Sequence, residues 1–173
     1  MIDRRELLRR QLRVAWSLAE YHLQRVTTES LLWEPSTSCW TVHRDSEGTW
    51  RPDWMVPEPD PTPPPTAAWV SWHLGWWWTE ALAQLTGQAP PGREDITWPG
   101  DAAATVTWLR ALHDAWVAQL DALKEADLDA PVTFPWPREA DRSVADLLAW
   151  VNVELTKNTA EIGQLTMIFT ARQ

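Results

Sequence analysis

An i, i+4, i+7 set of polar residues interrupts an apolar helical pattern near the C-terminus. The set is Glu154, Asn158 and Glu161, and on a helix its members fall within about 60° of one another. They border the apolar stripe, so they face the seam with a neighbouring helix. Two carboxylates and an amide in such a seam must be hydrogen-bonded, ion-paired or bound to a metal ion. The spacing therefore indicates either a metal site or a structural network with arginine side chains or indole N–H groups.

Three histidines, His22, His73 and His113, also fall on apolar helical stripes. A histidine in that position is either a hydrogen-bonded core residue or a ligand. His73 is the most conspicuous, because it is the one imidazole in the middle of a segment that is apolar nearly all round. Inward-facing Glu and His from several helices build the metal sites of helical bundles. His43 lies in a loop pattern, and we expect it to be solvated.

Several other kinds of chemistry are excluded by the sequence. It contains no glycine-rich phosphate loop and no Gly-x-Ser-x-Gly elbow, and Cys39 is its single cysteine, so an internal disulfide or a cysteine-based zinc site is ruled out. The balance of 15 basic against 24 acidic residues, net charge -9, disfavours nucleic acid as a partner. No apolar run approaches the roughly 18 residues of a membrane span, and no segment resembles a signal peptide. We therefore expect a cytoplasmic protein, and no catalytic residue can be assigned.

Four segments carry helical periodicity. They are residues 3–27, 66–86, 101–124 and 143–169. Thr66, Asp101 and Ser143 are suitable N-caps, and Gly87 is a suitable stop for the second segment. Because there is no strand-rich half and no internal repeat, the sequence predicts an all-α four-helix bundle in a single domain spanning residues 1–173.

A long link joins the first two helices, and its prolines exclude a continuous helix. Residues 39–43 and 49–51 flank a turn-like segment and predict a short irregular hairpin, whereas residues 57–65 predict an extended polyproline-like connector. The link is either a plain surface loop or a flap over a pocket. The flap is suggested by four indoles in the link, because such large apolar rings are expected to pack over another surface. They are Trp33, Trp40, Trp50 and Trp54.

Tryptophan accounts for 15 of the 18 aromatic residues. The second helix is apolar all round and should lie centrally in the bundle, with Trp72, Leu74 and Trp77 buried. A bundle of this size can hardly bury 15 indoles in one core, and exposed aromatic patches tend to become interfaces. The composition therefore predicts a homodimer.

Three short motifs, which follow one another along the chain, resemble motifs of the DinB superfamily. Residues 31–35 (LLWEP) and 39–42 (CWTV) resemble the segment after its first helix. Residues 69–74 (WVSWHL) resemble its second-helix motif, which carries a histidine metal ligand. Residues 158–165 (NTAEIGQL) resemble its last-helix motif, usually His-x-x-x-His followed by a residue, Gly and Gln. Their joint order covers essentially the whole chain.

The resemblance implies an up-down-down-up four-helix bundle. Some members are metal-dependent thiol transferases that use mycothiol or bacillithiol, including maleylpyruvate isomerases, whereas many have no known activity. His73 matches the second-helix ligand, but Lys157 and Glu161 stand where the two last-helix histidines are expected. Protonated Lys does not ligate a metal, so the usual three-histidine site is broken. Oxygen donors from Glu154 and Asn158 could compensate.

The leading hypothesis is a DinB-like bundle with a Trp-lined pocket in which His73, Glu154, Asn158 and Glu161 hold zinc or nickel. Such a metal would lower the pKa of a low-molecular-weight thiol and hold a thiolate that attacks a small electrophile. The alternatives are a non-catalytic protein that binds a small apolar or aromatic molecule, and a bundle whose molecular role is oligomerisation alone. A Lys157 ammonium close to Glu154 or Glu161 would replace the metal with an internal ion pair and favour the binding protein.

Overall fold

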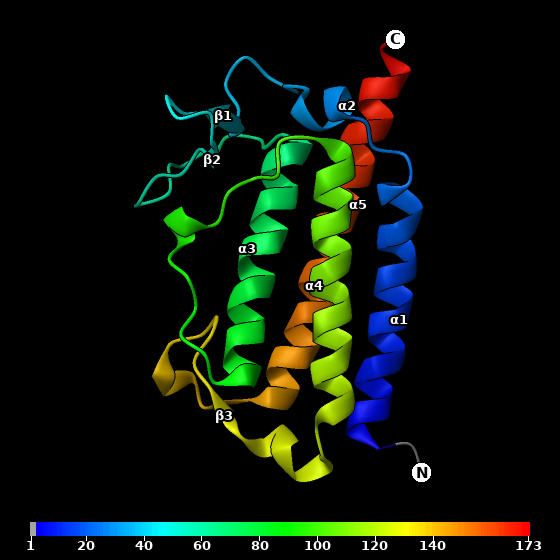
Figure 1. The fold of residues 1–173 in the computed structure, drawn as a ribbon, viewed down its shortest axis with the longest axis vertical. Helices are drawn as coiled ribbons and strands as arrows, with labels where there is room; N and C mark the ends of the chain where they lie inside the picture. The colour runs from blue at the N-terminus through cyan, green and yellow to red at the C-terminus, as the bar shows by residue number, and fades with distance from the viewer. Residues whose placement is uncertain (1–2) are drawn as a thin grey trace.

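The computed structural model describes residues 3–173, and most of them are helical, which confirms the all-α prediction. The α-helices are α1 (Arg4–Leu23), α2 (Thr28–Leu32), α3 (Ala67–Thr86), α4 (Ala102–Ala122) and α5 (Val144–Ala171). The four long helices lie side by side, and the short α2 lies across the end of the molecule near the C-terminus (Figure 1).

The predicted starts of α3, α4 and α5 and the predicted end of α3 are confirmed by their caps, whereas α4 ends at Ala122, two residues earlier than predicted, and α5 continues two residues further, to Ala171. The side chains of Thr66, Asp101 and Ser143 each accept a hydrogen bond from the backbone N–H three residues later. Gly87 ends α3 in the left-handed conformation, with φ of 67°. These residues satisfy backbone groups that the ends of a helix leave unpaired.

The first helix is shorter than the periodicity predicts, because it ends at Leu23 and not at Thr27. Thr27 instead caps α2, where its side chain accepts from the Ser30 backbone and the Ser30 side chain accepts from the Thr27 backbone. This reciprocal capping box starts a new helix of five residues. The link between the first two long helices therefore contains a helix that the sequence pattern did not indicate.

The predicted hairpin in the link is confirmed. Strands β1 (Val42–Arg44) and β2 (Trp50–Pro52) pair antiparallel, with His43 opposite Arg51. As expected, the His43 side chain is exposed, and its Nε2 lies 3.1 Å from Asp53 Oδ1.

A second pair of strands precedes α5 and was not predicted. Strands β3 (Pro131–Val132) and β4 (Arg142–Ser143) are two residues each and pair antiparallel. They join the second Pro-rich link to the N-cap of α5. Three short 3-10 turns complete the links: Arg93–Asp95, Glu125–Asp129 and Arg138–Ala140.

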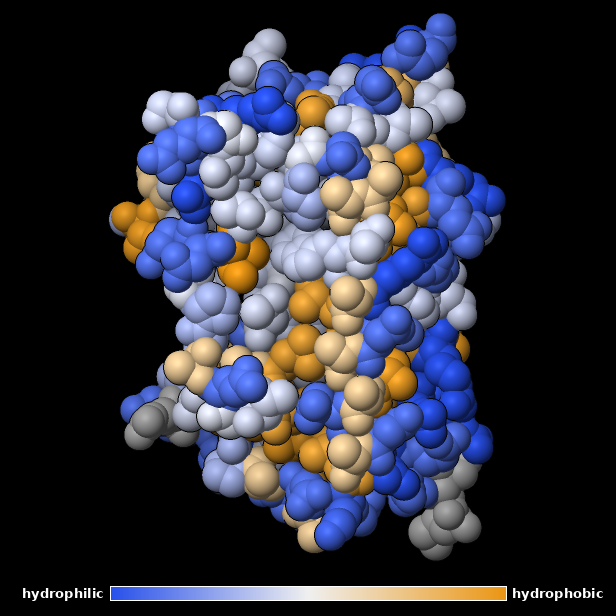
Figure 2. Space-filling view, in the orientation of Figure 1, coloured by the Kyte–Doolittle hydropathy of each residue, from blue (hydrophilic) through white to orange (hydrophobic). Residues whose placement is uncertain are grey.

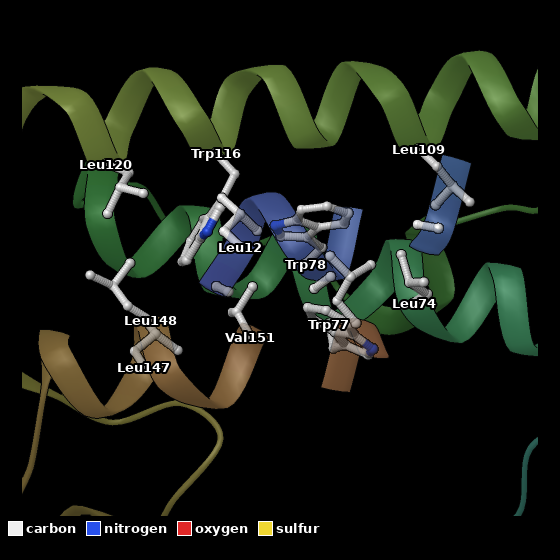
Figure 3. Packing of buried hydrophobic residues seen from close by; sticks show 14 of the residues in the cluster. Leu12, Leu74, Trp77, Trp78, Leu109, Trp116, Leu120, Leu147, Leu148 and Val151 are labelled. Atoms are coloured by element: carbon white, nitrogen blue, oxygen red, sulfur yellow. The ribbon is translucent and has the colours of Figure 1, made fainter. Parts of the chain in front are cut away.

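The main core fills the space between the four long helices, where indoles pack among leucines from every helix (Figure 3). Trp72, Leu74 and Trp77 are at most 2% exposed, as predicted. A second cluster lies between the link and the first half of α3, and its largest buried members are Trp40, Trp69, Trp72 and Trp98.

The predicted homodimer was inferred from the assumption that the chain leaves some of its indoles exposed, and this assumption is wrong. Each of the 15 tryptophans is buried or half-buried within the chain itself. The premise treated the bundle as one core, whereas the link between α2 and α3 adds a second apolar cluster that covers the indoles of α3. A dimer therefore needs another physical basis.

The face of the molecule seen in Figure 2 carries both hydrophobic and hydrophilic side chains, in separate areas. Figure 2 shows hydrophobic residues gathered in a band along α4 and between α4 and its neighbours, with mostly hydrophilic residues along the α1 margin. Part of that margin is held by Arg110, which forms two 2.8 Å hydrogen bonds to Glu20 and so ties α4 to α1. In the part of the chain that the structure describes, no helix has the length and apolar character needed to cross a bilayer.

Candidate functional site

The candidate site lies in the seam between α3 and α5, and a hydrogen-bonded amide holds its two sides together. Trp77 Nε1 on α3 donates to Asn158 Oδ1 on α5 at 2.9 Å. Asn158 Nδ2 donates in turn to Glu161 Oε2 at 2.9 Å. Asn158 is only 1% exposed, so both of its bonds replace water that it has lost. The indole therefore fixes which end of the amide faces the Glu161 carboxylate.

Lys157 lies between the two carboxylates of the predicted site. Its Nζ is 3.3 Å from Glu154 Oε2 and 3.9 Å from Glu161 Oε1. The three residues are spaced i−3, i and i+4, so a single helix face brings them together. Lys157 is about half-exposed, and such a pair contributes less than about 1 kcal/mol to stability. The ammonium therefore sets the charge of the site more than it stabilises the fold.

His73 lies on the α3 side of the seam, within a cluster of indoles. Its ring is stacked on Trp69, with a centroid distance of 5.0 Å and an interplanar angle of 10°, and it lies 5.5 Å from Trp76. Burial, and to a smaller extent the positive charge of Lys157, lower the pKa of His73 to about 4. The imidazole is therefore neutral at pH 7. Its Nδ1 is buried and has no hydrogen-bond partner.

The link between α2 and α3 covers this cluster. Trp54 stacks over Trp69 at 6.0 Å and 10°, and over His73 at 6.3 Å and 18°. Trp40 joins the stack at 5.9 Å from Trp54. The Trp54 Nε1 is buried without a hydrogen-bond partner. The indoles of the link therefore lie on α3 at the position of His73, which is the arrangement that the flap hypothesis requires.

Two cavities open beside this cover. The larger has a volume of about 420 Å³, and its walls are formed by Arg51, Pro52, Trp54 and the segment 93–95. The Arg93 guanidinium lies 4.4 Å from the centre of the Trp54 ring in a cation–π contact. A smaller cavity of about 230 Å³ lies between the prolines of the link and α5, with the Glu161 carboxylate in its wall.

The four predicted ligands are only partly brought together. Asn158 and Glu161 are hydrogen-bonded to each other, whereas Glu154 joins them only through Lys157. Across residues 3–173, no three His, Cys, Asp or Glu side chains form a group that could hold a metal ion. The donor set fits a divalent cation poorly, because an ammonium lies between the carboxylates and the amide is engaged at both ends. Zinc or nickel binding by His73 and these residues stays a prediction that a titration must decide.

Comparison with known families places this geometry in context. The profile of the DinB superfamily matches residues 11–162 of the 173-residue chain. The chain belongs to the DinB superfamily. Comparison with curated proteins found no match. The DinB match covers His73, Lys157 and Glu161, so the departures from the three-histidine pattern lie within the matched segment.

The other two helix-borne histidines have structural surroundings in this DinB bundle. The ring of His22 on α1 packs directly against Gly163 of α5. His113 on α4 stacks on Trp16 of α1 at a centroid distance of 4.0 Å, and its Nδ1 lies 3.0 Å from Asp114 Oδ1. Both therefore belong to helix packing and not to the seam around His73.

Sequence reasoning missed two features of the DinB site. One is the bond from Trp77 to Asn158, although indole N–H groups were among the expected partners of the α5 edge. The signal was available, because Trp77 lies on a helix that is apolar all round, and Asn158 borders the apolar stripe of the helix that the resemblance pairs with it. The other is Arg93 beside Trp54, which lies in a short 3-10 turn where no periodicity distinguishes it.

Proposed function

We propose that this DinB-superfamily protein binds a small apolar or aromatic molecule without a metal ion, and that the Lys157 ammonium takes the place of the metal. The observation that carries the proposal is the position of Lys157 Nζ, 3.3 Å from Glu154 and 3.9 Å from Glu161. The ammonium compensates the charge of the two carboxylates, and it would repel a divalent ion brought to the same place. A metal would have to displace the lysine before it could use the carboxylates.

We also propose that the helices follow the up-down-down-up order of the superfamily within one domain spanning residues 1–173. The course of the chain in Figure 1 supports this order, because α1 and α5 run toward the end where the C-terminus lies, whereas α3 and α4 run away from it. The order makes α3 and α5 antiparallel neighbours. It thereby aligns the turn that contains His73 with the turn that contains Glu161.

The cavity beside Trp54 is the proposed binding place. Its volume of about 420 Å³ lies within the range of roughly 300–1,000 Å³ that is usual for small-molecule pockets. The Trp54 indole gives this cavity an apolar aromatic wall, and the guanidinium groups of Arg51 and Arg93, which also line it, offer hydrogen-bond donors. A small aromatic molecule with an acceptor atom fits that chemistry.

A metal titration tests the first part of the proposal. Nickel or zinc should leave the melting temperature of the wild type unchanged. The double variant Lys157→His/Glu161→His completes a three-histidine set with His73, and saturating metal should raise its melting temperature by roughly 5–10 °C through mass action. Adding His73→Ala should abolish that rise. A rise in the wild type that His73→Ala removes would overturn the metal-free proposal.

Tryptophan fluorescence tests the second part. Small aromatic acids and amines should quench and shift the emission of the wild type, and Trp54→Leu should weaken that response at least tenfold. Trp116→Phe is the matched control, because Trp116 is buried in the main core away from the cavity. Equal quenching of all three proteins would show that the cavity is not the binding place.

A metal-dependent thiol transferase is the second candidate function, and one observation favours it. The buried Nδ1 of His73 has no hydrogen-bond partner, and a metal ion would satisfy it. The assay is the consumption of an electrophile such as maleylpyruvate in the presence of mycothiol or bacillithiol, with and without added zinc or nickel. Turnover that requires both thiol and metal, and that His73→Ala removes, would establish this function.

The protein is further proposed to act in the cytoplasm as a homodimer, without nucleic acid as a partner. The net charge of -9 supports the last point, because it repels phosphate backbones. Absence of any shift with DNA or RNA in a mobility assay at low salt is the expected result.

A further inference from the structure

The cavity beside Trp54 contains a guanidinium group that has no anionic partner within the described chain. Arg93 is half-buried, and its guanidinium carbon lies 4.4 Å from the centre of the Trp54 ring. Across residues 3–173, the Arg93 side chain takes part in no ion pair and no hydrogen bond. Burial removes water from a charged group, so its N–H groups need acceptors. A guanidinium held against an aromatic ring is suited to a carboxylate, which can accept two of its N–H bonds at once.

Two carboxylates in the wall of the same cavity have no cation beside them. Glu94 and Asp95 follow Arg93 in the 3-10 turn that lines the cavity. A Cβ atom on Gly92 would lie 2.7 Å from Glu94 Oε1 and 3.0 Å from Asp95 Oδ2, so the two oxygens lie close together on one side of the turn. Within residues 3–173, neither carboxylate forms an ion pair, and Asp95 Oδ2 accepts a hydrogen bond from the Gly92 N–H at 3.0 Å. A cation beside two such charges would relieve their repulsion.

The second guanidinium of the cavity is already engaged within the chain. Arg51 Nε lies 3.2 Å from Asp45 Oδ2, and Arg51 Nη1 donates to the backbone oxygen of Glu94. The cavity therefore presents one uncompensated positive charge, at Arg93, and two negative charges. On a chain of net charge -9, a ligand that is only an anion is repelled by the molecule as a whole.

Both sides of the cavity are anchored on helix α3. Trp72 Nε1 donates to the backbone oxygen of Ile96 at 2.7 Å, which holds the residue that follows the 3-10 turn. Trp69 Nε1 donates to the backbone oxygen of Asp53 at 2.7 Å, which holds the residue that precedes Trp54. Because the walls are fixed in advance, little conformational entropy is lost when a ligand binds between them.

We infer that this cavity binds a small zwitterion of the amino-acid type, with a carboxylate and an ammonium group on an apolar body. The carboxylate pairs with Arg93, the ammonium lies against Glu94 and Asp95, and the apolar body contacts Trp54. Such a molecule satisfies both kinds of unpaired charge and adds no net charge to the complex. An acid or an amine of the same size satisfies one kind and leaves the other unpaired.

The inference rests on the proposed function, because it names the class of molecule that binds beside Trp54. It does not depend on the α3–α5 seam, because the described walls of the cavity contain none of the four predicted metal ligands. The cavity volume of about 420 Å³ is toward the lower end of the range usual for small-molecule pockets, which suits a ligand of this size.

Calorimetric titration of the full chain with three matched compounds tests the inference. L-phenylalanine carries both charges, phenylpropionate lacks the ammonium, and phenethylamine lacks the carboxylate. The wild type should bind phenylalanine at least about tenfold more tightly than either of the other compounds, because each loses a charge-assisted contact. This comparison uses the unmodified protein, so it does not depend on whether a variant folds.

Substitutions in the wall assign each charge to its partner. Arg93→Gln should weaken the binding of phenylalanine at least about tenfold and make it equal to that of phenethylamine. The double variant Glu94→Gln/Asp95→Asn should make phenylalanine equal to phenylpropionate, and its asparagine can still cap the turn. Arg44→Gln is the matched control, because Arg44 makes a cation–π contact with an indole of the hairpin at 5.3 Å but lies outside the cavity walls. It should bind all three compounds as the wild type does.

The outcomes separate the inference from the proposed function. Absence of binding of all three compounds at millimolar concentration overturns both. Equal affinity of the wild type for phenylalanine and for phenylpropionate or phenethylamine overturns the zwitterion alone and leaves binding beside Trp54 intact. A preference for phenylalanine that survives in Arg93→Gln and in the double acidic variant, with unchanged melting temperatures, overturns this cavity as the binding place.

Discussion

Gly163→Ala is a direct test of how α5 is positioned against α1. A Cβ on Gly163 would overlap the Nδ1 and Cε1 atoms of His22, and it would lie only 2.7 Å from His22 Cγ. Rotation of the ring about χ2 does not move Cγ, so either the whole side chain changes its rotamer or the helices separate. Van der Waals contact requires a displacement of roughly 1 Å.

Two opposing effects decide whether Gly163→Ala raises or lowers the free energy of unfolding. Alanine is more favourable than glycine inside a helix by roughly 0.5–1 kcal/mol. Overpacking of a well-filled contact costs about 1–3 kcal/mol. We therefore expect Gly163→Ala to lower the free energy of unfolding by about 1–2 kcal/mol, or the melting temperature by roughly 3–6 °C for a domain of this size.

Removal of the His22 ring should reverse the sign of the effect of Gly163→Ala on the free energy of unfolding. In a His22→Ala background the overlap is absent, so Gly163→Ala should raise the free energy of unfolding by about 0.5–1 kcal/mol. Urea denaturation followed by tryptophan fluorescence measures all four proteins of the double-mutant cycle. Stabilisation by Gly163→Ala in both backgrounds would refute the reasoning, because the contact with His22 would then have no energetic effect.

Three further predictions follow from contacts elsewhere in the bundle. Trp72→Ala should lower the free energy of unfolding by about 3–5 kcal/mol in urea denaturation, because the indole is fully buried; a loss below about 1 kcal/mol would contradict its place in the core. Gly75→Ala should destabilise the wild type but stabilise a Trp108→Ala variant in thermal melts, since the Trp108 ring lies against Gly75. The Arg110 hydrogen bond lowers the pKa of Glu20, so the ion pair stabilises above the usual carboxyl pKa and loses its effect as pH falls through the lowered one. Arg110→Met should therefore cost up to about 1 kcal/mol at pH 7 and progressively less as the pH falls below the usual carboxyl pKa, and a cost that does not change with pH would contradict the linkage.

The helices of this chain could be predicted because local signals and global packing agree. Thr66, Asp101 and Ser143 are caps by residue type alone, and each cap is confirmed by a hydrogen bond to the backbone three residues later. The short α2 was missed for a physical reason: five residues are too few to show a periodicity of 3.6. The β3–β4 pair was missed because two-residue strands have no alternation to detect.

The sequence predicted which residues form the candidate site, but not the hydrogen bonds and ion pairs that they make. Helical phase alone places Glu154, Asn158 and Glu161 on one edge of α5. The phase does not show that Asn158 turns its oxygen toward Trp77, because that choice depends on the partner helix. Nor does it show where the Lys157 side chain lies, since a long flexible chain at the helix surface can reach either carboxylate.

The α3–α5 seam shows how a DinB bundle can hold its last helix in place without metal coordination. In a three-histidine site the metal ion links the second long helix to the last one. Here the bond from Trp77 to Asn158 links the same helices, and it is buried, so breaking it leaves an unpaired polar atom at a cost of about 1–3 kcal/mol. Lys157 supplies the positive charge that the adjacent carboxylates require, within a single helix. The bond from Trp77 to Asn158 thus supplies the structural linkage, and Lys157 supplies the charge compensation, that one metal ion would provide together in a three-histidine site.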